Sequence, residues 1–226
     1  ALGNNQYDTI FTTNPDPSLN DAPSSTHAFG DFDNDGKIEF AMGGLSGTYW
    51  LYESPVNNTY ERIIQGYLPT ANIVDCFSVP DADGDGKMEF VVKGFTIYGT
   101  PSFKVQPFIF EATGNNTYEI IKSFNFDYEP TESYYGGYSE AGDVDGDSIP
   151  EIVLEASNNV YIIKSAGNDS FYVWDTLPGH LYGSCVRIFD IDDNGLSEVI
   201  ISGEDETRIY EYVPEGIVED TRYRIQ

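Results

Sequence analysis

Short segments in which apolar and polar residues alternate recur along the chain, and no long stretch shows the 3.6-residue period of an amphipathic helix. Tyr, Phe, Val and Ile are frequent in these segments, and Gly, Pro, Asn and Asp lie between them. Aromatic residues make up 15% of the chain, which together with 40% hydrophobic residues is enough for a packed core. This pattern predicts an all-β protein.

A unit of four predicted strands repeats along the sequence. Its second and third strands are the clearest, for example residues 90–94 (FVVKG) and 105–112 (VQPFIFEA), and a turn then leads to a fourth strand such as 118–124. Four strands in about 50 residues are typical of the blades of a β-propeller. We therefore expect a single β-propeller domain over residues 1–226, with about four blades of four antiparallel strands each. The expected repeats cover approximately residues 24–66, 72–125, 136–178 and 182–226.

The N-terminal residues resemble the end of a blade. Residues 3–11 (GNNQYDTIF) align with residues 57–64 and 114–122, which join third to fourth strands. Residues 7–13 could close a four-bladed ring by completing the last blade, or the chain could be a piece of a larger propeller. A third alternative is that an unpaired strand edge recruits a strand of another subunit. We favour the four-bladed ring, because the missing strand and the surplus strand match.

Four acidic loops align without gaps, one in each repeat. They are residues 31–39 (DFDNDGKIE), 81–89 (DADGDGKME), 143–151 (DVDGDSIPE) and 190–198 (DIDDNGLSE). Positions 1, 3 and 5 are Asp, except for an Asn at position 5 of the last loop, and position 9 is always Glu. Position 6 is Gly except for Ser148, so the third loop is expected to turn differently.

The loops have the composition of calcium sites. Ca²⁺ takes six to eight oxygen ligands, and alternate carboxylates in a tight loop, a backbone carbonyl at position 7 and the Glu at position 9 supply them. An EF-hand would need its bidentate Glu at position 12, but that position is apolar in all four loops and strands follow. The expected cofactor is thus Ca²⁺, up to four ions, in strand–loop–strand sites. The expected ligands are Asp31, Asp33, Asp35, Lys37, Glu39; Asp81, Asp83, Asp85, Lys87, Glu89; Asp143, Asp145, Asp147, Ile149, Glu151; Asp190, Asp192, Asn194, Leu196 and Glu198.

The repeat with its acidic loop resembles the FG-GAP or VCBS repeats of integrin-like β-propellers, over approximately residues 24–213. The resemblance implies a propeller in which the loop between the first two strands of a blade binds calcium. It also implies a binding module at a cell surface. Asn194 lowers the charge of the fourth loop and Ser148 interrupts the third, so the first two loops are expected to bind best.

The charge of the chain limits its partners. With 38 acidic and 11 basic residues the formal net charge is −27, which argues against nucleic acid and against anionic membrane surfaces as partners. No apolar run reaches the ~18 residues of a membrane-spanning helix. Calcium sites of the kind expected in the four loops suit extracellular calcium concentrations, so we expect a secreted or cell-surface protein.

Aromatic residues near the second and third repeats suggest a ligand surface. Tyr98, Tyr128, Tyr134 and Tyr135 fall in predicted loops, where they could stack on a carbohydrate or pack against a protein; ordinary loop packing is the alternative. Asn-rich pairs at 57–58, 115–116 and 168–169 occupy one equivalent turn, where residues that tolerate positive φ are needed.

Catalysis has little support, because no nucleophile, base or phosphate loop stands in a recognisable arrangement, and we do not expect an enzyme. The expected function is adhesion, recognition or assembly at a cell surface or matrix through protein or carbohydrate partners, with structural calcium. Two alternatives remain: a non-catalytic or scaffold domain of a secreted polysaccharide-acting enzyme, and a self-assembling subunit of a surface filament joined through strand edges.

Overall fold

The structure is a computed structural model that describes residues 8–13, 23–96, 104–127, 137–180, 184–203, 206–213 and 216–219. These residues form β-strands and loops and contain no helix. Accordingly, no helix of the described chain is long and apolar enough to cross a membrane.

The strands form four antiparallel sheets, each made of strands that follow one another in sequence. The first sheet contains β1 (Pro23–Gly30), β2 (Glu39–Gly44), β3 (Thr48–Glu53) and β4 (Glu61–Tyr67). The second contains β5 (Asn72–Val79), β6 (Glu89–Phe95), β7 (Lys104–Gly114) and β8 (Thr117–Ser123), and the short β9 (Phe126–Asp127) also pairs with β7. The third contains β10 (Glu140–Gly142), β11 (Glu151–Ala156), β12 (Asn159–Ser165) and β13 (Phe171–Pro178). The fourth contains β14 (Cys185–Phe189), β15 (Glu198–Ser202), β16 (Thr207–Val213) and β17 (Gly216–Glu219).

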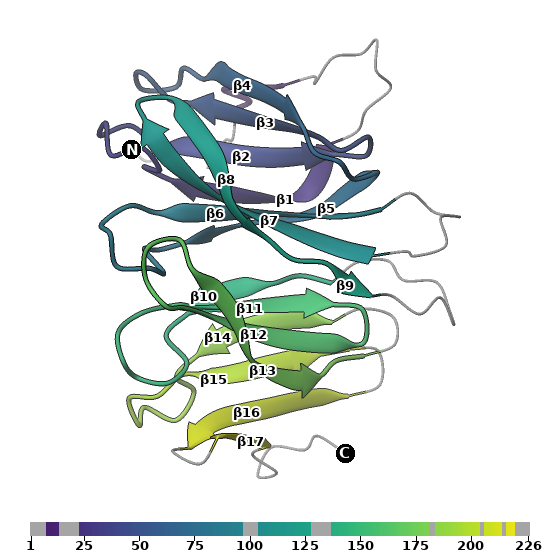
Figure 1. The fold of residues 1–226 in the computed structure, drawn as a ribbon. Helices are drawn as coiled ribbons and strands as arrows, with labels where there is room; N and C mark the ends of the chain where they lie inside the picture. The colour runs from purple at the N-terminus through teal and green to yellow at the C-terminus, as the bar shows by residue number, and fades with distance from the viewer. Residues whose placement is uncertain are drawn as a thin grey trace, which may run out of the picture.

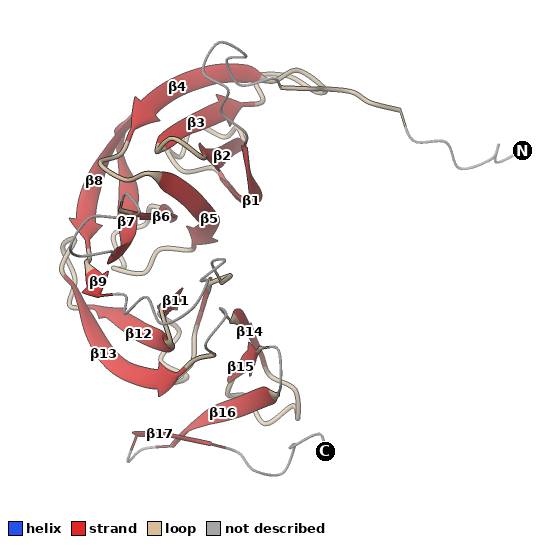
Figure 2. Cartoon of the chain, turned by 90° about the vertical axis from the view of Figure 1, so that its right-hand side faces the viewer, coloured by secondary structure: helices blue, strands red, loops and turns tan. Residues whose placement is uncertain are grey.

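The sheets are stacked in chain order (Figure 1). Viewed from the side they follow an arc, with β1, β5 and β14 toward its inside and β4, β8 and β13 on its outside (Figure 2). The predicted all-β fold of four-stranded, propeller-like blades is therefore confirmed. Within the described part of the chain the four blades trace an open arc and do not close a ring.

Alternation along the strands builds the core between the sheets. Phe90 belongs to the buried cluster that β6 shares with the first sheet, and the next residue, Val91, belongs to the cluster shared with the third sheet. A third cluster joins the third and fourth sheets through residues such as Val153 and Val186. Both faces of the inner blades are thus buried, which explains why their strands read as nearly continuous apolar runs.

The N-terminal segment takes a different place from the one expected. Phe11 packs against the rings of Phe40 and Tyr52, at centroid distances of 6.4 and 5.8 Å, and the hydroxyls of Thr13 and Tyr52 share a hydrogen bond of 2.5 Å. Phe11 and Thr13 therefore contact the first blade. The last blade has its own fourth strand, β17, so the strand exchange expected of residues 7–13 is not found for the described residues 8–13.

A buried lysine links the second and third blades. The ammonium group of Lys93 donates hydrogen bonds to the carbonyl oxygens of Gly137 and Glu155, at 2.8 and 2.9 Å, and lies 3.3–3.4 Å from carboxylate oxygens of Glu155 and Asp75. Its side chain is fully buried. Because a buried charge without its partner is costly, these groups depend on one another.

Replacing Lys93 by Met should destabilise the protein by about 3–5 kcal/mol, because the two carboxylates lose their buried counter-ion. Urea denaturation followed by tryptophan fluorescence measures the change. Lys122→Met, at a partly exposed position of β8, is the control and should change stability by about 0.5 kcal/mol or less. Equal stability of the two variants would contradict the proposed role of Lys93.

Candidate metal centre

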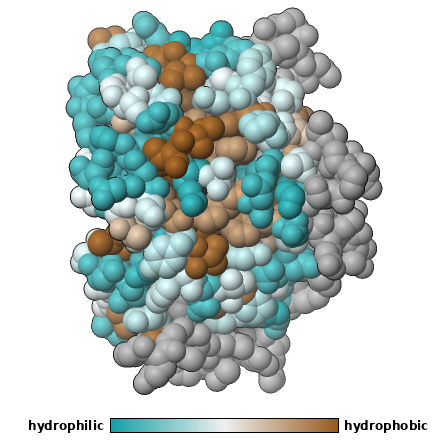
Figure 3. Space-filling view, viewed as in Figure 1, coloured by the Kyte–Doolittle hydropathy of each residue, from teal (hydrophilic) through white to brown (hydrophobic). Residues whose placement is uncertain are grey.

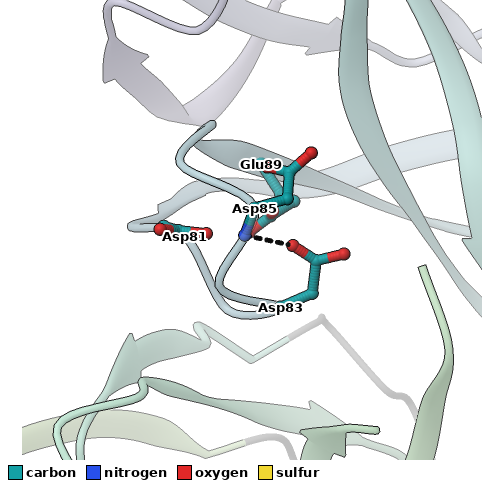
Figure 4. Close-up of side chains that lie close together, drawn as sticks. All are labelled: Asp81, Asp83, Asp85 and Glu89. Carbon is teal, nitrogen blue, oxygen red and sulfur yellow. Dashed lines mark hydrogen bonds between the residues drawn. The ribbon is translucent and has the colours of Figure 1, made fainter. Parts of the chain in front are cut away.

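Each acidic loop joins the first strand of a blade to the second, and the glutamate at position 9 is the first residue of that second strand. The loops gather at one end of the sheets, on the left in Figure 1, and hydrophilic side chains dominate this edge of the surface (Figure 3). Figure 4 shows the second loop, in which the side chains of Asp81, Asp83, Asp85 and Glu89 lie close together.

One hydrogen bond closes all four loops. The backbone N–H at position 2 donates to Oε2 of the glutamate at position 9. The four bonds are Phe32 to Glu39, Ala82 to Glu89 and Val144 to Glu151, each 2.9 Å, and Ile191 to Glu198, 2.7 Å. In the first three loops the residue at position 2 is also buried in the core, so it anchors the loop to the interior.

The turn inside the loop also repeats. The backbone N–H at position 7 donates to the side-chain oxygen at position 5 over 2.8–3.0 Å, from Lys37, Lys87, Ile149 and Leu196 respectively. Positions 4 and 6 have positive φ in every loop. Ser148 adopts φ 71°, close to the 87° of Gly36, so the expectation of a different turn in the third loop is wrong. The serine takes the left-handed conformation at a cost of roughly 1–2 kcal/mol relative to glycine.

The first two loops contain buried carboxylate oxygens that accept no hydrogen bond. These atoms are Oδ1 of Asp31, Oε1 of Glu39, Oδ1 of Asp81 and Oε1 of Glu89. Oxygens of Asp31, Asp33 and Glu39 lie within 4.8 Å of one another, and so do oxygens of Asp81, Asp83, Asp85 and Glu89. Unpartnered, converging anionic oxygens are the donor set that Ca²⁺ requires, so the residues of these two loops fit a calcium ion.

Burial disfavours the ionised form of the position-9 glutamates in the first two loops, Glu39 and Glu89, when no cation is bound. Loss of solvent raises the pKa of Glu39 to about 7 and that of Glu89 to about 8, against the hydrogen bonds from Phe32 and Ala82 that favour the charged form. Neighbouring aspartates, among them Asp33 and Asp83, raise both values further. A bound cation would reverse these shifts.

A further position, on the third strand of each blade, faces the closing glutamate. Glu53 pairs with Glu39 in the β2–β3 ladder, and Glu111 follows Phe110, the partner of Phe90. By the same register, Lys164 stands opposite Glu151 and Glu211 opposite Glu198. The sequence analysis did not include this position among the candidate ligands.

The lysines at position 7 of the first two loops lie at the outer side of the site. Lys37 Nζ lies 2.7 Å from an oxygen of Asp35 and 2.8 Å from one of Glu53, and Lys87 pairs with Asp85 and Glu111 in the same way. Both lysine side chains are more than one third exposed. They neutralise part of the charge while the buried oxygens further in stay without a partner.

The third loop is neutralised from within. Lys164 Nζ pairs with Asp145 and lies 3.4 Å from an oxygen of Asp147 and 3.3 Å from Oε1 of Glu151. Burial alone would lower the pKa of Lys164, but the surrounding carboxylates outweigh it and raise the pKa above its usual value. The ammonium group also lies 4.5 Å from the ring centre of Trp174, over its face.

The fourth loop is the most open. Positions 2 to 6, residues 191–195, are exposed. Asp190 accepts hydrogen bonds from the N–H groups of Asn194 and Gly195, and the Asn194 amide donates to Glu211 over 3.1 Å. At position 5, where the other three loops have a charged Asp, the fourth loop therefore has a neutral Asn194 that donates a hydrogen bond to Glu211 on the third strand.

The hairpin turn of the next blade contacts each of the first two loops. The N–H of Asn116, between β7 and β8, donates to Oδ2 of Asp33 over 2.6 Å, and the N–H of Asp169, between β12 and β13, donates to Oδ2 of Asp83 over 2.9 Å. Both turn residues have positive φ, in agreement with the Asn-rich turns expected there. The position-3 aspartates thus belong both to the loop and to the contact between blades.

Four tyrosines were expected to form a ligand surface. Tyr98, Tyr128, Tyr134 and Tyr135 all lie outside the residues that the structure describes.

Comparison with known families agrees with the repeat. Residues 31–92, from the first loop through the second, match the family model of the FG-GAP-like repeat, so the resemblance noted from the sequence is confirmed there. A search among curated proteins found no match to the chain. The repeat and the four-sheet arc together indicate a β-propeller-like binding module.

In the absence of calcium the protein should lose stability as the pH rises from about 5 to 8.5. Folding raises the pKa of both glutamates, so ionising them lowers the free energy of unfolding. This loss is absent below the pKa of the unfolded chain, near 4.5, and complete above the pKa of the folded protein, about 7 for Glu39 and about 8 for Glu89. Melting temperatures measured in EGTA across this range test the expectation.

Glu89→Gln is the matched variant for this pH series. Its amide cannot ionise, so its melting temperature in EGTA should fall less steeply with pH than that of the wild type. The same slope in both proteins would show that general charge repulsion, and not the buried glutamate, causes the dependence.

Proposed function

We propose that this protein is an extracellular, calcium-stabilised propeller-like module that binds a partner and has no catalytic role. The observation that carries the calcium assignment is the set of buried, unpartnered oxygens of Asp31, Glu39, Asp81 and Glu89. An ion bound there would satisfy them, oppose the raised pKa of the glutamates and neutralise part of the charge of −27.

The calcium ions would be structural. Each loop ties the first strand of a blade to the second, and in the first two loops the position-3 aspartate also holds the turn of the next blade. An ion in the loop therefore stabilises both a blade and its contact with the following one. Extracellular calcium, near the millimolar range, suits loop sites whose ligand charges are partly balanced by lysines, which supports a secreted or cell-surface location.

Binding is the role that the FG-GAP-like repeat favours, and the partner we propose is a protein or carbohydrate at a cell surface or matrix. The large negative charge disfavours nucleic acid and anionic membranes as partners.

Calcium should raise the stability of the protein markedly. At a free concentration one hundred times the dissociation constant, each site adds about 2.7 kcal/mol. Differential scanning calorimetry in EGTA and in millimolar calcium, with magnesium as the competing ion, measures this effect. An unchanged melting temperature on calcium addition would refute the structural role.

Asp81→Asn should weaken calcium binding at the second loop by removing a charged ligand, with a loss of at least tenfold in affinity measured by isothermal titration calorimetry. Asp175→Asn, on β13 and away from the loops, removes the same charge and should leave all affinities unchanged. Equal effects of the two substitutions would indicate a general charge effect rather than a site.

A further inference from the structure

The four loops share their backbone geometry but differ in how their carboxylates are neutralised. The difference lies at the position opposite the closing glutamate, which is glutamate in the first, second and fourth blades and Lys164 in the third. The third loop also lacks the lysine found at position 7 of the first two, because Ile149 stands there. The third blade thus has its lysine on the third strand of the sheet, whereas the first two blades have theirs at position 7 of the loop.

The ammonium group of Lys164 reaches the carboxylates that would hold a metal ion. It contacts position 3 (Asp145), position 5 (Asp147) and position 9 (Glu151) of the same loop. Lys37 and Lys87, by contrast, contact only position 5 and the glutamate of the third strand. The Lys164 side chain is 14% exposed, against 36% for Lys37.

The buried oxygens report the same difference. The first two loops each keep a position-1 and a position-9 oxygen without a hydrogen-bond partner, whereas no oxygen of the third loop is among the buried unpartnered atoms of the described residues. In the third loop, Asp143 accepts hydrogen bonds from the N–H groups of Gly146 and Ser148. One oxygen of Glu151 accepts the N–H of Val144, and the other lies 3.3 Å from the ammonium group of Lys164. Oxygens of Asp143, Asp145 and Glu151 also lie within 4.8 Å of one another, as in the first two loops, but here each carboxylate oxygen already has a hydrogen-bond or ionic partner.

We propose that Lys164 is a built-in cation that takes the place of calcium in the third loop, so that this blade keeps its loop closed without metal. This inference rests on the proposed calcium function of the other loops. An ammonium group that already lies among three of the loop carboxylates repels a calcium ion brought to the same oxygens, so it competes with the metal for this cage. The same ammonium group lies over the Trp174 ring, a cation–π contact that adds to its stabilisation at this position.

The calcium stoichiometry of the whole chain, measured by equilibrium dialysis in millimolar calcium, tests the proposal. Lys164→Glu restores the residue of the other three blades and should bind one more calcium ion than the wild type. Lys122→Glu makes the same charge change outside the loops and should leave the stoichiometry at the wild-type value. Failure of Lys164→Glu to gain an ion, with its β-sheet circular dichroism intact, would overturn the proposal.

A second pair of variants keeps the test valid if Lys164→Glu does not fold. Asp145→Asn should leave the wild-type stoichiometry unchanged, whereas Asp83→Asn, at the same position of the second loop, should cost one ion. Loss of an ion in Asp145→Asn would show that the third loop of the wild type holds calcium, and would overturn the role of Lys164 while the calcium function stands. Absence of calcium from the wild type and all variants would instead refute the calcium function itself.

Discussion

The glutamate that begins the second strand of each blade is the group on which the rest of the structure depends. Its carboxylate is buried at the end of a strand and accepts the N–H at position 2, while the side chain of that residue enters the core in the first three blades. Strand, loop and core are thereby fixed by one residue. The same burial makes the carboxylate costly as an anion, so each blade needs a compensating cation, a proton or access to water.

The blades meet this requirement in different ways. The first and second place lysines at the outer side and leave inner oxygens that suit a metal ion. The third brings Lys164 to the carboxylates, and the fourth exposes its loop to solvent and replaces one aspartate by Asn194. The four loops therefore share one backbone conformation but differ in the charged groups around their carboxylates. The identity of two or three side chains decides what each loop can bind.

The sequence predicted the strands and the loops well, because both depend on local patterns. Alternation identified β-strands, and Asp and Glu at fixed positions identified the loops, whose hydrogen bonds repeat as the spacing implied. Lys164 and Glu53 were missed, since their place opposite the closing glutamate depends on the register between two strands. Aligning the third strands would have revealed that position. Phe11 was misplaced because similarity to a hairpin does not state which blade the segment joins.

Contacts between blades extend the effect of each loop beyond its own sheet. Asp33 and Asp83 each have one oxygen in the loop turn and the other on the N–H of a turn from the following blade. A cation that fixes these carboxylates therefore also fixes the neighbouring hairpin, while Lys93 joins the second and third blades from within the interface. Along the arc of described strands, this coupling fixes how adjacent blades sit against each other. Under the proposed function, calcium would thus set the curvature of the surface that the arc presents to a partner.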